Sequence, residues 1–110
     1  MLAQENKTGL IFNQTEYDFD TISDSGPYIY DFVFKNSGDI PVLISSVFSS
    51  CGCIVVEYPR NPILKGESGM VKVKYNATSD GYFTKLVIVK TDEENNNKIV
   101  LRIKGVVKKE

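Results

Sequence analysis

The sequence predicts an all-β fold, an immunoglobulin-like antiparallel β-sandwich of about seven strands. Three features lead to this prediction. Apolar and polar residues alternate with a period of two over most of the chain, turn-forming Gly, Pro, Asn and Asp interrupt the alternation about every ten residues, and no segment shows sustained helical periodicity. At 110 residues, the chain has room for a single domain with one hydrophobic core.

The first three predicted strands cover residues 10–13, 28–36 and 42–48. In the second of these, aromatic residues stand at alternate positions, as expected for a strand with one buried face. The polar turn that follows it contains Gly38, the residue best suited to a positive φ angle. The third strand is entered through Pro41, which fits the first position of a strand because no ladder donor is needed there.

Four further strands are predicted over residues 54–57, 69–77, 82–91 and 99–107. Polar residues alternate with Val and Tyr in the strand 69–77, so its polar face should lie in solvent. In the next strand, residues 86–89 form an uninterrupted apolar run, which is typical of a more completely covered strand near the centre of a sheet. The polar stretch between the last two strands predicts a protruding hairpin loop.

The charge balance argues against nucleic acid as a partner. Thirteen basic and fourteen acidic residues leave a formal net charge of −1, so no global field attracts a phosphate backbone. The apolar runs are far shorter than the roughly 20 residues of a membrane-spanning helix, and no transmembrane segment is predicted. We expect the sandwich to span residues 9–108. Residues 1–8 are expected to form a disordered tail, either a remnant of a signal peptide or an ordinary terminus.

Several segments of the chain resemble one bacterial domain family, the domain of unknown function numbered 1573. The most specific are Asn-Ser-Gly-Asp-Ile-Pro-Val-Leu-Ile at residues 36–44 and Ser-Cys-Gly-Cys at residues 50–53. The remaining segments are residues 17–22, 59–69 and 73–76. Asp20 departs from the pattern, because a Gly is usual at this point of the family's opening segment. The resemblance covers nearly the whole chain.

The resemblance implies the sandwich fold and a secreted, periplasmic or cell-envelope location. Members of this family are typically exported proteins of Bacteroidetes, often lipoproteins or parts of larger surface proteins, and are similar to major sperm protein and ciliary immunoglobulin-like domains. No Cys lies near residue 1, so these residues do not indicate lipid anchoring. Because no activity is assigned to the family, the resemblance implies no reaction.

Catalysis is not expected, because the sequence contains no His. His is the usual base for Ser, Cys and Thr nucleophiles and the commonest ligand of catalytic zinc. The acidic residues form no pattern that singles out a pair for glycoside hydrolysis. The sequence therefore predicts a non-catalytic module that needs no cofactor and provides a binding or scaffolding surface for a protein or glycan partner.

Cys51 and Cys53, separated by Gly52, support an alternative function. Three states of this pair are open: a short disulfide ring, two thiols buried in the sandwich, or a metal or redox site. Two thiolates suit a soft metal such as Cu(I) or Zn(II), although a tetrahedral site needs further ligands. The alternative is therefore a soft-metal-binding or thiol redox protein that uses both cysteines.

Tyr58, Pro59 and Pro62 are the candidate partner-binding residues. The segment 58–63 is bracketed by the two prolines, so it should be stiff and extended, either as an edge presented to a partner strand or as a crossing between the sheets. Other tyrosines near strand ends either anchor a loop or contact a partner. These tyrosines are Tyr17, Tyr28 and Tyr82. The open sheet edges of a sandwich also allow an edge-strand homodimer.

Overall fold

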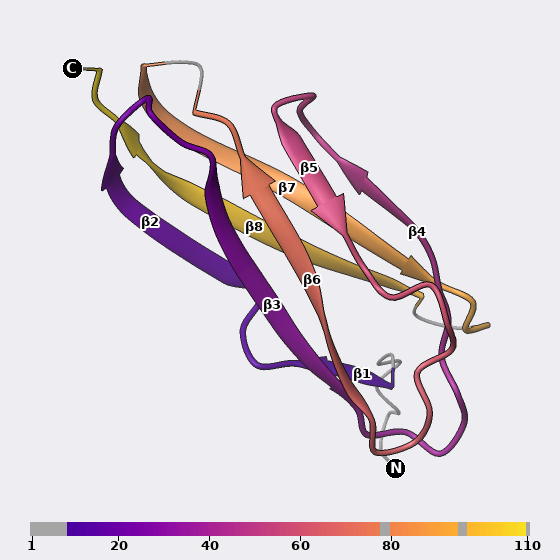
Figure 1. Ribbon diagram of the computed structural model, residues 1–110. Coiled ribbons are helices and arrows are strands. Elements are labelled where there is room, and N and C mark those ends of the chain that lie inside the picture. The colour runs from indigo at the N-terminus through magenta and orange to yellow at the C-terminus, as the bar shows by residue number, and fades with distance from the viewer. Residues whose placement is uncertain (1–8, 78–79, 95–96, 110) are drawn as a thin grey trace, which may run out of the picture.

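The computed structural model describes residues 9–77, 80–94 and 97–109, which form two packed β-sheets (Figure 1). No helix long and apolar enough to span a membrane occurs in these ranges. The tail predicted at residues 1–8 lies outside the described residues. The strands are β1 (Leu10–Phe12), β2 (Glu16–Ile22), β3 (Tyr28–Asn36), β4 (Ile44–Ser49), β5 (Ile54–Glu57), β6 (Ser68–Tyr75), β7 (Gly81–Thr91) and β8 (Lys98–Val107).

The strands form two four-stranded sheets, here called sheet A and sheet B. Sheet A has the order β1-β3-β6-β5 and is antiparallel throughout. Sheet B has the order β2-β8-β7-β4, and its β2–β8 pair is parallel while its other pairs are antiparallel. The turn from β4 to β5 carries the chain from sheet B to sheet A along one side of the sandwich (Figure 1).

The predicted sandwich is confirmed, with one strand more than expected. The prediction omits β2, which lies at the edge of sheet B beside β8. Tyr17 and Phe19 of β2 pack against the core, but a register shift between Asp18 and Thr21 interrupts the ladder. Asp20 stands in this irregular segment with a φ angle of 64°. Residues 16–20 alternate between acidic and aromatic side chains, so the sequence contains a signal for this strand that the prediction did not use.

The core lies between the two sheets and follows the predicted alternation. The fully buried side chains of the central strands are Phe32, Phe34, Val71, Val73, Val87, Val89, Leu101 and Ile103. Burial of each contributes about 2 kcal/mol relative to its exposure. β7 takes the central position that its apolar run predicts. The expected cover on both faces is not found, because Leu86 and Ile88 face away from the core and are only partly covered.

Asn36, the last residue of β3, forms buried hydrogen bonds at one end of the sandwich. Its side chain is fully buried, and its amide nitrogen donates to the carbonyl oxygens of Ile40 at 2.9 Å and Ile63 at 2.8 Å. Its amide oxygen accepts a hydrogen bond from Gly38 N at 3.0 Å. Because the buried amide nitrogen and oxygen of Asn36 both have partners, these bonds hold the turn after β3 and the segment 58–63 in place.

The prediction of a positive φ angle at Gly38 is wrong. Among the described glycines, only Gly66 and Gly81 have positive φ angles. A Cβ atom at Gly38 would lie 3.3 Å from the Gly9 Cα atom and 3.4 Å from the Asn36 side-chain oxygen. The turn therefore favours Gly because of its close approach to the residue that precedes β1, and a positive φ angle is not the reason.

Candidate functional site

Cys51 and Cys53 are joined by a disulfide in the turn between β4 and β5. Their Cα atoms lie 5.1 Å apart, and both residues are half-buried against the core. The Cys51 carbonyl oxygen accepts a hydrogen bond from Ile54 N at 3.3 Å, so the turn leads directly into β5. Of the three states that the sequence leaves open, the structure contains the short disulfide ring.

A metal site at this pair would need reduced cysteines, because the thiolate is the form that binds metals. Within the described part of the chain, no group of three or more His, Cys, Asp or Glu side chains is placed to hold a metal ion. Soft-metal binding by Cys51 and Cys53 therefore stays a prediction for the reduced protein.

Tyr58 and Pro59 line a hollow of about 430 Å³ at the point where the chain leaves β5. The other lining residues are Glu57, Gly69, Met70 and Lys72. β5 pairs with only the second half of β6, so the hollow lies beside the first half of β6. A Cβ atom at Gly69 would lie 2.8 Å from the Phe34 ring, so a larger residue at this position would force the core to shift.

The first half of β6 has an open edge beside this hollow. Residues 68–71 pair with β3 on one side, and no described strand pairs with them on the other side. Alternate backbone N–H and C=O groups of an edge strand point away from its partner, so this edge offers hydrogen bonds to an added strand. The hollow thus combines main-chain polar groups with the apolar side chain of Met70, which is 43% exposed.

The segment 58–63 belongs to the connection between β5 and β6, which are both strands of sheet A, so it is not a crossing between the two sheets. Its last residue contacts the region before β4. Ile63 N donates to the Val42 carbonyl oxygen at 2.7 Å, and Val42 N donates to the Ile63 carbonyl oxygen at 3.0 Å. Val42 belongs to this isolated bridge, so β4 begins at Ile44, later than predicted. Pro62 is exposed and does not line the hollow.

Both signs of charge border the hollow. Glu57 Oε2 lies 3.8 Å from Lys74 Nζ, and Glu57 stands opposite Lys72 in the β5–β6 ladder. The Arg60 guanidinium lies 4.3 Å from the centroid of the Tyr58 ring, which is a cation–π distance. Because neither sign dominates, the hollow favours main-chain and apolar contacts over selection by charge.

The other tyrosines near strand ends, Tyr17, Tyr28 and Tyr82, differ in their contacts. The Tyr28 hydroxyl accepts a hydrogen bond from Ser23 N at 3.1 Å and so anchors the β2–β3 turn. A hydrogen bond with the Ser23 side chain is the main cause that lowers the pKa of Tyr28. Tyr17 stacks on Tyr30 with ring centroids 3.9 Å apart, which fastens β2 to β3 across the sandwich. The Tyr82 side chain is 91% exposed.

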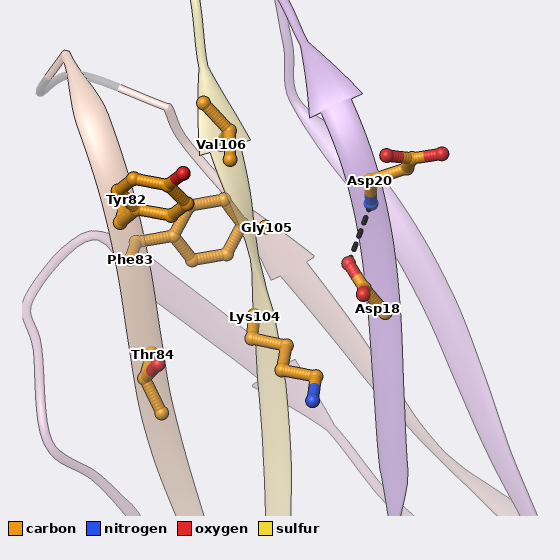
Figure 2. A pocket seen from close by; sticks show the side chains of 8 residues that line it. All are labelled: Asp18, Asp20, Tyr82, Phe83, Thr84, Lys104, Gly105 and Val106. Atoms are coloured by element: carbon orange, nitrogen blue, oxygen red, sulfur yellow. Dashed lines mark hydrogen bonds between the residues drawn. The ribbon is translucent and has the colours of Figure 1, made fainter.

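A second hollow, of about 250 Å³, lies beside the irregular part of β2 (Figure 2). Asp18, Asp20, Lys104 and the ring of Tyr82 are among the residues that border it. Asp20 N donates to Asp18 Oδ1 at 2.7 Å, so the Asp18 carboxylate supports the irregular backbone. A Cβ atom at Gly105 would lie 2.8 Å from the Asp20 carbonyl oxygen, which shows how closely β2 approaches β8.

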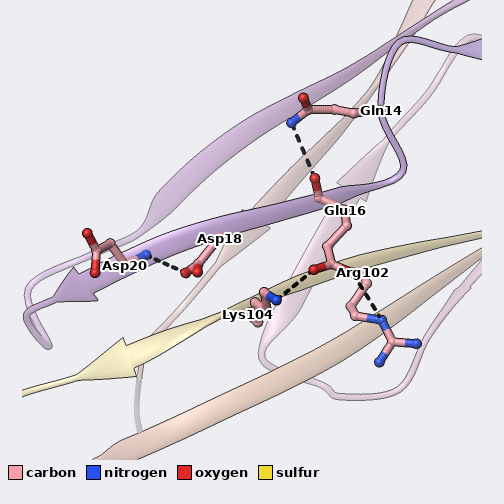
Figure 3. A network of polar contacts seen from close by, with 6 residues as sticks. All are labelled: Gln14, Glu16, Asp18, Asp20, Arg102 and Lys104. Atoms are coloured by element: carbon pink, nitrogen blue, oxygen red, sulfur yellow. Dashed lines mark hydrogen bonds and ion pairs between the residues drawn. The ribbon is translucent and has the colours of Figure 1, made fainter.

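The acidic side of β2 faces basic residues of β8 across the parallel ladder (Figure 3). Glu16 Oε2 lies 2.7 Å from Lys104 Nζ, and Glu16 Oε1 lies 3.8 Å from Arg102 Nε. The hydrogen bond with Lys104 lowers the pKa of Glu16, and the same bond raises the pKa of Lys104. Glu16 and these two cations are thereby engaged in attaching β2 to sheet B.

A known protein family matches almost the whole chain. The family described as "Protein of unknown function (DUF1573)" matches residues 10–107, which include every described strand. The chain belongs to the DUF1573 family. The resemblance noted in the sequence is therefore confirmed. No curated protein sequence matches this DUF1573 chain.

Solved structures with the DUF1573 sandwich come from several kinds of protein. The ASH / PapD-like domain of human CEP192 (PapD-like domain 7) has a TM-score of 0.79 at 8% identity, covering 99% of this chain and 92% of that one. A protein of unknown function from Porphyromonas gingivalis W83 has a TM-score of 0.77 at 14% identity, covering 94% of this chain and 49% of that one. The YadV chaperone has a TM-score of 0.62 at 14% identity, covering 94% of this chain and 53% of that one. These likenesses show a shared PapD-like fold, and the DUF1573 chain spans about half the length of the last two structures.

The structure brings Tyr58 and Pro59 together in the first hollow and leaves Pro62 outside it. It adds Met70, which the sequence pattern treats as an ordinary strand residue. One signal for Met70 is present in the sequence, because the next outward residue of the same strand, Lys72, is charged and Met70 is apolar. The end of β5 at Glu57 leaves residues 68–71 of β6 without this partner. It has no local signal in the sequence, since it depends on the contact of the segment 58–63 with Val42.

Proposed function

We propose that this DUF1573 domain is a non-catalytic protein-binding module of the bacterial cell envelope that captures an extended segment of a partner beside β6. The observation that carries the proposal is the open edge of residues 68–71 next to the hollow lined by Tyr58, Pro59 and Met70. An added strand would continue sheet A along this edge. Main-chain hydrogen bonds would supply affinity, and side chains entering the hollow would supply selectivity.

The properties of the hollow support this role. Its volume of about 430 Å³ lies within the range of pockets that hold ligands, so it has room for side chains of an extended segment. Pro59 fixes its own φ angle and Tyr58 packs against the core, so one wall is rigid. Met70 is flexible and polarizable, which suits a surface that accepts more than one apolar side chain.

The fold and the cysteines support an exported binding protein. A chaperone is among the structures that share the fold. The sequence lacks His, which removes the usual base of hydrolytic enzymes. The disulfide between Cys51 and Cys53 fits an oxidising compartment such as the periplasm, where disulfides form and persist.

Site-specific cross-linking tests this proposal. A photo-reactive amino acid at position 70, in protein incubated with periplasmic extract, should cross-link to an extended segment of a partner that mass spectrometry identifies. Met70→Arg places a charged chain in the hollow and should lower capture of that partner about tenfold. Val33→Arg is the matched control, because Val33 stands opposite Met70 on β3 but does not line the hollow.

Two results would contradict the proposal. One is the absence of any cross-link from position 70, and the other is an equal loss of capture in the Met70 and Val33 variants. Both side chains are partly exposed, so each variant should keep the folded spectrum by circular dichroism.

Soft-metal binding or thiol exchange at Cys51 and Cys53 is a second candidate function. The observation in its favour is that the two sulfurs already meet in a half-buried turn, where reduction would release two neighbouring thiolates. Elemental analysis of reduced protein incubated with copper or zinc, together with exchange against glutathione, tests this function. If the reduced protein binds no metal and exchanges no thiol with glutathione, the role of the disulfide is structural. Replacing both cysteines by Ser should then leave partner capture intact.

A further inference from the structure

A band of apolar side chains crosses the outer face of sheet B on β4, β7 and β8, which lie side by side (Figure 1). Its two outer members are exposed and its central member is half-buried. The sheet B band consists of Phe48, Ile88 and Val100, with Phe48 opposite Ile88 and Ile88 opposite Val100. Phe48 is 65% exposed and Val100 is 47% exposed. A continuous row of this kind on a surface is characteristic of an interaction site.

The apolar run in β7 strengthens this interpretation. Residues 86–89 have the pattern of a strand that is covered on both faces. In the described fold the core covers Val87 and Val89, while Leu86 and Ile88 belong to the outer face. The sequence of β7 therefore fits a strand whose second face is covered by another molecule.

Two lysines border the sheet B band at one end. Lys90 and Lys98 are exposed and stand directly opposite each other in the β7–β8 ladder. Each is two residues from a member of the band, so it lies on the same face of the sheet. Like charges directly opposite destabilise a sheet, and neither lysine belongs to an ion pair among the described residues. An anionic group placed between the two lysines would relieve this repulsion.

We propose that the sheet B band, with Lys90 and Lys98, is a docking surface for an acidic segment of a partner protein. Apolar side chains of that segment cover Phe48, Ile88 and Val100, and its carboxylates lie between the two lysines. Complementarity of charge and of apolar surface selects the partner.

The charge pattern favours such a partner over a second copy of this chain. Lys90 and Lys98 lie at one end of the band, and Arg102 stands opposite Leu86 at the other end. Two copies that meet through this face would bring cations toward cations. Glu16 offers no relief, because it is already engaged by Arg102 and Lys104.

The same pattern disfavours an anionic membrane. Lipid-binding clusters contain about four to eight Lys or Arg residues, and only two uncommitted lysines border the band. The formal net charge of −1 also gives the whole chain no attraction to an anionic surface. An acidic segment of a polypeptide can bind with carboxylates placed only beside the two lysines.

The probe for the test is a labelled peptide with the sequence Glu-Glu-Leu-Phe-Leu-Glu-Glu, followed by fluorescence anisotropy. One comparison peptide has Lys in place of Glu, and another has Ser in place of the apolar residues. Only the acidic apolar peptide should bind, with an affinity that falls as salt is added. Phe48→Ser and Lys98→Glu should each weaken binding about tenfold.

Lys98→Glu separates binding from stability, because the two readouts move in opposite directions. The substitution places a carboxylate opposite Lys90, so the melting temperature should rise while peptide affinity falls. Lys35→Glu makes the same change of charge on sheet A and should leave peptide affinity unchanged.

Four results would overturn the proposal. They are absence of binding by the acidic apolar peptide, equal binding by the Lys-containing peptide, equal weakening by Lys98→Glu and Lys35→Glu, and a dimer in sedimentation equilibrium that Phe48→Ser abolishes. Vesicles of equal parts phosphatidylglycerol and phosphatidylcholine provide the membrane arm. Binding to these vesicles that is lost in Lys98→Glu, without binding of the acidic peptide, would assign the surface to lipid instead.

Discussion

At the scale of single residues, the buried amide of Asn36 shows how one polar side chain positions a distant segment. The sequence places Asn36 at the end of a strand and the start of a turn. Its contact with Ile63 joins residues 27 positions apart, so no local pattern indicates it. The rigidity of the segment 58–63, and with it the wall of the hollow at Tyr58 and Pro59, depends on this contact.

Asn36→Ala should lower the free energy of unfolding by about 3 kcal/mol, because it leaves the carbonyl groups of Ile40 and Ile63 and the Gly38 N–H without their partner. Urea denaturation measures this loss as a lower midpoint with an unchanged slope. Asn61→Ala, at an exposed position of the segment 58–63, should change the free energy of unfolding by less than about 0.5 kcal/mol. Equal effects of the two substitutions would show that Asn36 has no special role.

At the scale of elements, β2 forms one edge of sheet B. The β2–β8 pair is the only parallel pair among the described strands, and β2 lies at a sheet edge, where pairing is otherwise open. Besides the main-chain ladder, two kinds of contact attach β2 to β8: the close approach of the irregular segment at Asp20 to Gly105, and the ion pairs of Glu16. Each contact predicts a separate effect on stability.

Gly105→Ala should lower the free energy of unfolding by about 2 kcal/mol, because the new Cβ atom would lie 2.8 Å from the Asp20 carbonyl oxygen and 3.0 Å from the Phe83 ring. Gly52→Ala is the matched control, since no atom lies within 4 Å of a Cβ there, and it should be neutral or stabilising by about 0.5 kcal/mol. Chemical denaturation compares the two variants. A Gly105 variant as stable as the Gly52 variant would rule out close packing of β2 on β8.

Glu16→Gln should lower the melting temperature at neutral pH and have a smaller effect in acid. The bond with Lys104 lowers the pKa of folded Glu16 below its ordinary 4.5, so the stabilisation is present above that value and disappears as the pH falls through the folded pKa. The same bond raises the pKa of folded Lys104. The stabilisation that depends on the charged Lys104 therefore persists through neutral pH and disappears as the pH rises through its folded pKa.

Melting curves at pH 3 and pH 7 measure the effect of Glu16→Gln. Asp39→Asn serves as a control, because Asp39 pairs with Lys65 at 3.4 Å on an exposed surface and should contribute little. A melting difference for Glu16→Gln that is independent of pH would contradict the linkage to ionisation.

At the scale of the whole molecule, the two proposed surfaces belong to different sheets. The hollow at Tyr58, Pro59 and Met70 lies at the edge of β5 and β6 in sheet A. The sheet B band lies on β4, β7 and β8, on the outer face of the other sheet. Because the core separates the two outer faces, occupation of one leaves the other open, and a domain with both would join two partners.

Binding at the two surfaces should be independent. Met70→Arg should leave the affinity for the acidic apolar peptide unchanged, and Lys98→Glu should leave cross-linking from position 70 unchanged, since distant sites contribute additively. Anisotropy titrations and cross-linking yields of the two variants measure this. A change at one surface on substitution of the other would show that one partner contacts both sheets.

The sequence by itself determined the sandwich, the bounds of most strands, the family and the lack of His-based chemistry. Each of these follows from residue identity and from local alternation, which a strand shows wherever it lies. Only the tertiary structure decided the parallel pairing of β2, the disulfide state of Cys51 and Cys53, the hollow beside Met70 and the meeting of Lys90 with Lys98. These features depend on strand pairing and on contacts between residues far apart in the chain. Alternation indicates which face of a strand is buried, but it does not specify which strand lies beside it.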